Sequence, residues 1–150
     1  MAADPHGPNK LTDYIQIHET VMQQFIADGF VIRDGTGFTG YGIGLFLLDG
    51  PVECQGGIVL EVRKVLKRVD GHGASTRVQT IEYSYNGVLT GRGCILRYDG
   101  PHLHRPMHHV HRYDVLNGDK EGTIQPSEWP SLGQVVEELR AWYYDNFDKL

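Results

Sequence analysis

Apolar residues near the start of the chain follow the spacing of an amphipathic helix. Between Leu11 and Asp28 they recur every three or four positions, which brings them to one helix face, at Leu11, Tyr14, Ile15, Val21, Met22, Phe25 and Ile26. Thr12 can cap the start of this helix, and Gly29 stands where a left-handed residue would end it. His18 falls on the same stripe, so we expect it to pack against the core.

A second helix is predicted over residues 131–147. Ser131 and Gln134 have the spacing of a capping box, and the apolar positions again form one stripe, at Leu132, Val135, Val136, Leu139, Trp142, Tyr143 and Phe147. Trp142, Tyr143 and Tyr144 are consecutive and cannot all face one core. Tyr144 therefore either lies along the surface or marks an interface with a partner.

Between the two helices the pattern is typical of β-strands separated by glycine-rich turns. After a short apolar run at 30–32, strands are predicted at 41–48, 58–69, 77–85, 94–98 and 109–115. Asp49-Gly50-Pro51 and Asn86-Gly87 are turn signals, although the second loop can extend to Gly91. The strand at 77–85 would place Ile81, Tyr83 and Tyr85 on one side. Residues 118–130 are polar and predicted to be an irregular connection.

This order of elements predicts an α+β fold. We expect a curved antiparallel β-sheet of about five to seven strands, with the N-terminal and the C-terminal helix packed on one face. The 150 residues suit a single domain with its own core, and residues 1–10 are predicted to be a disordered leader. No apolar run approaches the eighteen or so residues of a membrane span, and no secretory signal precedes the first helix, so we expect a cytoplasmic protein.

Charge is unevenly distributed along a chain whose net charge is −5. Residues 58–112 carry nine Lys and Arg against four Asp and Glu, whereas the remainder carries five against fifteen. A basic centre in an acidic frame indicates a local anion site. The alternative is that Arg63, Lys64, Lys67 and Arg68 are the solvated charges of a strand edge. The isolated Cys54 and Cys94 are expected to be reduced.

Histidines gather in the segment from Ile81 to Val115. Five of the eight in the chain lie there, together with four arginines, at His102, His104, His108, His109, His111, Arg92, Arg97, Arg105 and Arg112. Imidazole exchanges protons near neutral pH, and guanidinium binds carboxylate or phosphate. Three interpretations stay open: a transition-metal site with Asp99 or Asp114, metal-free acid–base chemistry on a phosphate, or histidines that only hydrogen-bond an irregular loop.

The segment also resembles a known family. Tyr83-Ser84-Tyr85, the run Arg97-Tyr98-Asp99 with Pro101-His102, and Pro106 with His108-His109-Val110-His111 are similar to the motifs of the TumE-like toxin family, over roughly residues 58–145. Gly100 departs from the family's usual asparagine, and Met107 separates Pro106 from the histidine pair. The resemblance implies a small cytoplasmic toxin that is neutralised by a helix-turn-helix antitoxin and acts on RNA or the translation machinery.

Our leading hypothesis is therefore a toxin-like ribonuclease that needs no metal or other cofactor. The residues expected to catalyse are His108 and His109 as the acid–base pair, Arg97 as the phosphate ligand, His102 and His111 in support, and Asp99 as an orienting carboxylate. The residues expected to bind RNA are Tyr83 and Tyr85 by stacking, with Arg92, Arg105 and Arg112. The alternatives are a binding or assembly protein without catalysis, including a homo-oligomer, and a metal-dependent phosphoesterase that uses His109, His111 and Asp99.

Overall fold

The computed structural model describes residues 6–100, 108–114, 118–124 and 130–150. Two α-helices and nine β-strands are present in these ranges. The helices are α1 (Leu11–Ala27) and α2 (Leu132–Asn146). The strands are β1 (Asn9–Lys10), β2 (Val31–Asp34), β3 (Gly37–Gly40), β4 (Leu45–Cys54), β5 (Ile58–Asp70), β6 (Arg77–Leu89), β7 (Gly93–Asp99), β8 (His108–Asp114) and β9 (Gly118–Ile124).

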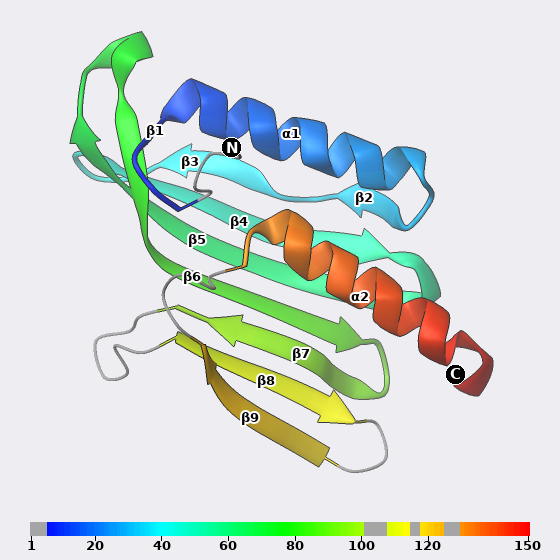
Figure 1. Ribbon diagram of the computed structural model, residues 1–150. Helices are drawn as coiled ribbons and strands as arrows, with labels where there is room; N and C mark the ends of the chain where they lie inside the picture. The colour runs from blue at the N-terminus through cyan, green and yellow to red at the C-terminus, as the bar shows by residue number, and fades with distance from the viewer. Residues whose placement is uncertain (1–5, 101–107, 115–117, 125–129) are drawn as a thin grey trace.

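All strands belong to one antiparallel sheet with the order β2-β4-β5-β6-β7-β8-β9 (Figure 1). The short strands β1 and β3 add to β6 and β4. Both helices lie on the same side of the curved sheet. The expected α+β fold, with the N-terminal and the C-terminal helix packed on one face, is therefore confirmed. Within the described ranges, neither helix has the length and hydropathy of a membrane-spanning segment.

The core lies between the helices and this face of the sheet. Residues that are paired across the strands share a face, and one such row consists of Val62, Tyr85, Tyr98 and Val110, all buried. From α2, Leu139 packs directly over Gly87, where an added Cβ would lie 2.7 Å from a Leu139 methyl carbon. The opposite face of the sheet carries no helix in the described structure, and we call it the open face.

The helix ends differ in how well the sequence predicts them. Ser131 accepts a hydrogen bond from the Gln134 amide at 3.2 Å, and the Gln134 side chain accepts one from the Ser131 amide at 2.8 Å, so the capping box is confirmed. Gly29 has φ +88° directly after α1, as expected of a C′ residue. Thr12, however, does not cap α1: the N-cap position is Lys10, which has no side-chain capping bond.

The predicted turn at Asp49-Gly50-Pro51 is wrong, because β4 continues through it. One edge of β4 pairs with β5 without a break, while the other edge changes its partner from β3 to β2 at this point. Pro51 accepts a hydrogen bond from the Gly35 amide at 2.8 Å. The carbonyl and the missing N–H of Pro51 both point to that edge, so the proline costs no ladder bond where the partner strand changes.

The predicted turn at Asn86-Gly87 is wrong for a similar reason. Strand β6 runs on to Leu89, and the glycine is needed because Leu139 packs over it. A β-bulge also interrupts β6: Leu66 pairs with Thr80 and Val65 with Glu82, so Ile81 has no partner. Ile81 is 39 % exposed and does not share the buried side of Tyr83, contrary to the simple alternation expected for this strand.

Two further segments are more ordered than their sequences indicate. Residues 6–10, expected to belong to a disordered leader, pack along β6: the His6 ring is buried, stacks on Tyr83 at 5.3 Å, and places Nε2 2.8 Å from the Pro130 carbonyl oxygen. Residues 118–124, expected to be irregular, form β9. An edge strand with no apolar alternation leaves little signal in the sequence.

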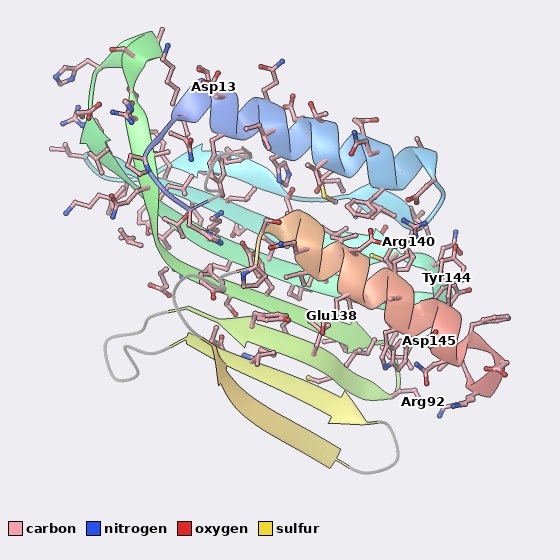
Figure 2. All side chains as sticks on the ribbon, in the orientation of Figure 1. Asp13, Arg92, Glu138, Arg140, Tyr144 and Asp145 are labelled. Atoms are coloured by element: carbon pink, nitrogen blue, oxygen red, sulfur yellow. The ribbon has the colours of Figure 1, made fainter. Side chains whose placement is uncertain are left out.

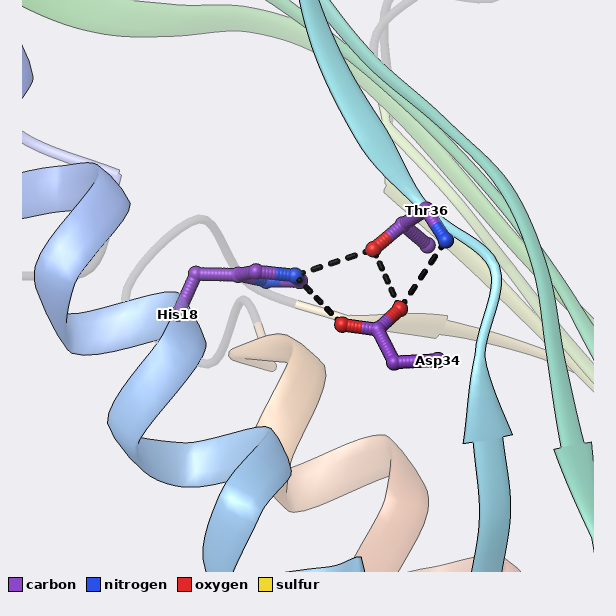
Figure 3. A network of polar contacts seen from close by, with 3 residues as sticks. All are labelled: His18, Asp34 and Thr36. Atoms are coloured by element: carbon purple, nitrogen blue, oxygen red, sulfur yellow. Dashed lines mark hydrogen bonds and ion pairs between the residues drawn. The ribbon is translucent and has the colours of Figure 1, made fainter.

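His18 joins α1 to the bend that follows β2 (Figure 3). Its Nε2 lies 2.9 Å from the Thr36 hydroxyl and 3.2 Å from the Asp34 carboxylate, and its ring meets Phe38 edge to face. Burial alone would raise the pKa of Asp34, but the hydrogen bonds from His18 and Thr36 outweigh it and hold that pKa below its usual value. His18 thus packs, as expected, and also forms a polar tie between helix and sheet.

Candidate functional site on the open face of the sheet

Two rows of polar residues cross the open face and end on β8, the strand that contains His108, His109 and His111. In one row, Cα partners run from Glu61 through Asn86 and Arg97 to position 111, and in the other from Arg63 through Ser84 and Asp99 to position 109. Strand alternation explains why these residues are together, since each is flanked in sequence by core residues such as Val62, Tyr85 and Tyr98. The site is thus built by β5, β6, β7 and β8.

Ion pairs hold the two arginines of these rows. Arg97 Nε lies 2.9 Å from an Asp99 oxygen, and the Asp99 side chain is only 9 % exposed while that of Arg97 is 47 % exposed. The guanidinium is therefore anchored at one edge and open to solvent on the other. Arg63 Nη1 also lies 2.9 Å from Glu82, but both side chains of this pair are exposed. The buried carboxylate of Asp99 gives the Arg97 guanidinium the more fixed direction, which suits recognition of an oxyanion.

A surface hollow of about 400 Å³ lies between these arginines. Its lining combines hydrogen-bond acceptors and donors from four neighbouring strands, and consists of Asp49, Gly50, Glu61, Val62, Arg63, Ser84, Asn86 and Arg97. Among these residues, Arg97 alone is one of the predicted catalytic or RNA-binding residues. The alternation of polar and apolar residues in β5 and β6 already places Glu61, Arg63, Ser84 and Asn86 on one face, and that was the available signal.

The backbone brings some of the predicted histidine positions to this site. His109 is the Cα partner of Asp99, and His111 is the partner of Arg97. Successive positions of a strand belong to opposite faces, so position 108 does not share the face of position 109. The expected acid–base pair of His108 and His109 is therefore not supported, and positions 109 and 111 form the pair that lies next to Arg97.

Other predicted residues are not brought to the same place. Arg92 precedes β7, whereas Asp99 ends it, so about 20 Å of strand separates them; Figure 2 shows Arg92 near the C-terminal end of α2. Arg112 is the Cα partner of the buried Leu96, so its position belongs to the helix-covered face. His102, His104 and Arg105 lie outside the described residues. Their expected place in the site therefore stays a prediction.

The expected stacking role of Tyr83 and Tyr85 is wrong. Their side chains are 1 % and 0 % exposed and belong to the core, so their rings cannot be offered to nucleic-acid bases. Burial raises the pKa of both phenols, and the nearby Asp99 carboxylate raises that of Tyr83 further. Among the described groups, none donates to or accepts from the buried Tyr85 hydroxyl.

Lys64 also differs from the basic residues with which it was grouped. It is 2 % exposed, and its Nζ lies 4.6 Å from the centre of the Tyr14 ring, a cation–π contact beneath α1. Lys64 therefore belongs neither to a solvated strand edge nor to a surface anion site. Arg63 remains on the open face, where it supports the anion-site interpretation.

A metal site cannot be built from the described side chains alone. No group of three or more His, Cys, Asp and Glu among them is arranged to hold an ion. Cys54 and Cys94 are free thiols, as expected, and burial raises the pKa of Cys54 to about 12. Of the three alternative metal ligands, Asp99 lies within the described residues, and the backbone places positions 109 and 111 beside it and its neighbour Arg97.

Comparisons with known proteins add no relative: no protein-family model matches the chain, and neither a curated protein nor a solved structure matches it.

Proposed function

We propose that the chain is a toxin-like protein of the TumE-like kind that cleaves RNA without a metal ion, using the open face beside β8. The observation that carries this proposal is the register of β7 with β8, which sets His109 and His111 opposite Asp99 and Arg97. The resemblance of the Arg97-Tyr98-Asp99 and histidine motifs to the toxin family supports it. On this proposal the toxin acts in the cytoplasm, and a helix-turn-helix antitoxin would bind and neutralise it.

The chemistry is transesterification through the RNA's own 2′-hydroxyl. One imidazole removes the proton of the 2′-hydroxyl, whose oxygen attacks the adjacent phosphorus. The bond from phosphorus to the 5′-oxygen breaks, and that oxygen takes a proton from the second histidine, which begins the step as a protonated imidazolium. The products are a 2′,3′-cyclic phosphate and a free 5′-hydroxyl. His109 and His111 would supply the two imidazoles, and Arg97 would stabilise the negative charge on the phosphorus oxygens.

Asp99 would act as a positioning residue in this scheme. Its carboxylate is largely buried and fixes Arg97 at 2.9 Å, and its backbone is opposite His109. A carboxylate in such a place orients a guanidinium or an imidazole rather than reacting with the substrate. Replacing Asp99 by Asn would keep the shape but weaken the hold on Arg97.

The test is cleavage of a mixed-sequence single-stranded RNA by the purified chain, with and without a chelator. We expect His109→Ala and His111→Ala each to lower the rate by about 10²-fold or more, the usual contribution of a general acid or base. His108→Ala is the matched control, because its position belongs to the other face, and it should retain activity. Equal activity of the His109→Ala, His111→Ala double variant and the wild type would refute the assignment.

A metal-dependent phosphoesterase is the second candidate, because the same register brings Asp99, His109 and His111 to adjoining positions. Two imidazoles and a carboxylate are a common ligand set for zinc or iron. Elemental analysis of the purified chain decides between the two. A stoichiometric metal that is lost in the His109→Ala, His111→Ala variant, together with activity abolished by chelator, would favour this candidate over the first.

A binding or assembly role without catalysis is the third candidate. At the end of α2, Tyr144 and Phe147 are 54 % and 57 % exposed, and Figure 2 shows Tyr144 at the surface of the helix. Exposed aromatic residues of this kind are enriched at interfaces. Light scattering would reveal a homo-oligomer, and Tyr144→Ser should dissociate it if this surface is the contact.

A further inference from the structure

The hollow on the open face presents carboxylate acceptors. Glu61 and Asp49 line it with exposed carboxylates, and neither forms an ion pair with any side chain in the described part of the chain. The arginines of the hollow, in contrast, are held by Glu82 and Asp99. A ligand of this hollow therefore needs hydrogen-bond donors that can meet a free carboxylate.

Asn86 supplies a donor beside one of these carboxylates. Glu61 and Asn86 are Cα partners on β5 and β6, so their side chains lie next to each other on the open face. The Asn86 carbonyl oxygen accepts a weak bond from the Cys94 thiol at 3.7 Å, which leaves the amide Nδ2 to donate to a ligand. The hollow thus offers a two-oxygen acceptor flanked by an amide donor.

This pattern is complementary to the Watson–Crick edge of guanine. Guanine places two parallel donors, N1–H and the 2-amino group, beside the O6 acceptor. One carboxylate can accept both donors, and the neighbouring amide can donate to O6. Adenine and cytosine carry one exocyclic donor beside a ring acceptor, and uracil carries one donor between two acceptors, so none of them satisfies both Glu61 oxygens. Edge readout of unpaired bases is the usual basis of sequence preference toward RNA.

The distance to the proposed reaction centre also fits one nucleotide. The row that contains Glu61 and Asn86 continues to Arg97 and position 111. Adjacent strands are about 4.8 Å apart, so Arg97 lies roughly 10 Å from Glu61, comparable to the span from the edge of a base to its phosphate. We propose that the Glu61–Asn86 hollow is a guanine subsite that positions an unpaired RNA nucleotide with its phosphate at Arg97. This inference rests on the proposed function.

The test measures binding rather than cleavage, so it does not depend on the catalytic assignment. Two single-stranded RNA pentamers that are identical except for a central guanine or adenine are titrated into the full chain by calorimetry. We expect the guanine pentamer to bind about tenfold more tightly. Glu61→Gln, which places an amide donor opposite the guanine donors, should abolish this preference. Glu53→Gln is the matched control, since Glu53 is a carboxylate of β4 that pairs with Arg33 and does not line the hollow.

Each outcome decides the inference. Preference for guanine that is lost in Glu61→Gln and kept in Glu53→Gln supports it, whether or not the RNA is cleaved. Preference for guanine without any cleavage would retain the subsite and overturn the proposed nuclease. Equal affinity for the two pentamers, no binding of either, or a preference that survives Glu61→Gln would overturn the subsite, even if the chain cleaves RNA. If the chain binds a basic protein instead of RNA, and Glu61→Gln abolishes that binding, the guanine subsite is overturned as well.

Discussion

The contact of Gly87 with Leu139 gives a sharp test of how α2 packs on the sheet. A Cβ added at Gly87 would lie 2.7 Å from one Leu139 methyl carbon and 3.2 Å from the other. Leu139 is 0 % exposed, so its methyl groups cannot move out into solvent. Gly87→Ala therefore forces α2 away from β6 or pushes Leu139 out of its rotamer.

The magnitude follows from two opposing terms. Overpacking a core by one methyl group costs about 1–3 kcal/mol, whereas replacing glycine by alanine stabilises by about 0.4–1 kcal/mol through the unfolded chain. We expect Gly87→Ala to lower the free energy of unfolding by about 1–2 kcal/mol. Leu139→Ala alone should cost about 2–5 kcal/mol. In the double variant, the new methyl group occupies the cavity, so the cost should fall short of the sum by about 1 kcal/mol.

The assay is urea unfolding of the four proteins, followed by far-UV circular dichroism. Gly37→Ala is the control, because Gly37 lies in β3 with no atom within 4 Å of an added Cβ and without a positive φ. It should leave the stability unchanged or raise it slightly. Gly87→Ala with wild-type stability, or additive costs in the double variant, would show that α2 does not press on β6 as described.

Three smaller effects are also expected. Ser131→Ala removes the N-cap of α2 and should cost about 1 kcal/mol in urea unfolding, and an unchanged midpoint would contradict the capping role. The pKa of Asp34 is lowered in the folded chain. The contribution of its carboxylate to stability is therefore fully present above the unfolded pKa and is lost as pH falls through the folded pKa. The unfolding midpoints of wild type and Asp34→Asn should converge in acid, and a constant gap would contradict this. Burial raises the pKa of Cys54 to about 12. Iodoacetamide at pH 8 should therefore label the half-buried Cys94 before Cys54, which mass spectrometry would show. Equal labelling of the two would contradict the burial of Cys54.

The sequence predicts the elements of this fold better than the connections between them. Both helices follow from long apolar stripes, since a helix buries a face of its own. The turn signals at Asp49-Gly50-Pro51 and Asn86-Gly87 failed because glycine and proline also serve where a partner strand changes or a helix comes close. His6 could not be found in advance, because one buried ring and a two-residue strand form no periodic pattern.

The candidate site was predictable only in part, for a related reason. Arg97, Asp99 and the histidines stand out because they are clustered along the chain. Glu61 and Asn86 are distant in sequence and belong to the site through the register of β5 with β6. Register depends on which strands pair and on the bulge at Ile81, and neither follows from the alternation of residue types. The same limit explains why His108 rather than His111 was expected to be the partner of His109.

The bulge at Ile81 bears on how such a chain can vary over generations. Strand β6 supplies Tyr83 and Tyr85 to the interior and Ser84 and Asn86 to the open face. Loss of one residue after the bulge, between Tyr83 and Asn86, would put these two sets out of phase with β5, and the hydroxyl and amide would replace phenol rings beneath the helices. Loss of Ile81, the unpaired residue of the bulge, would leave both sets on their faces. Homologues should therefore vary the length of β6 only at the bulge, while the identities of its outward residues drift, so a new specificity would arise there by substitution alone.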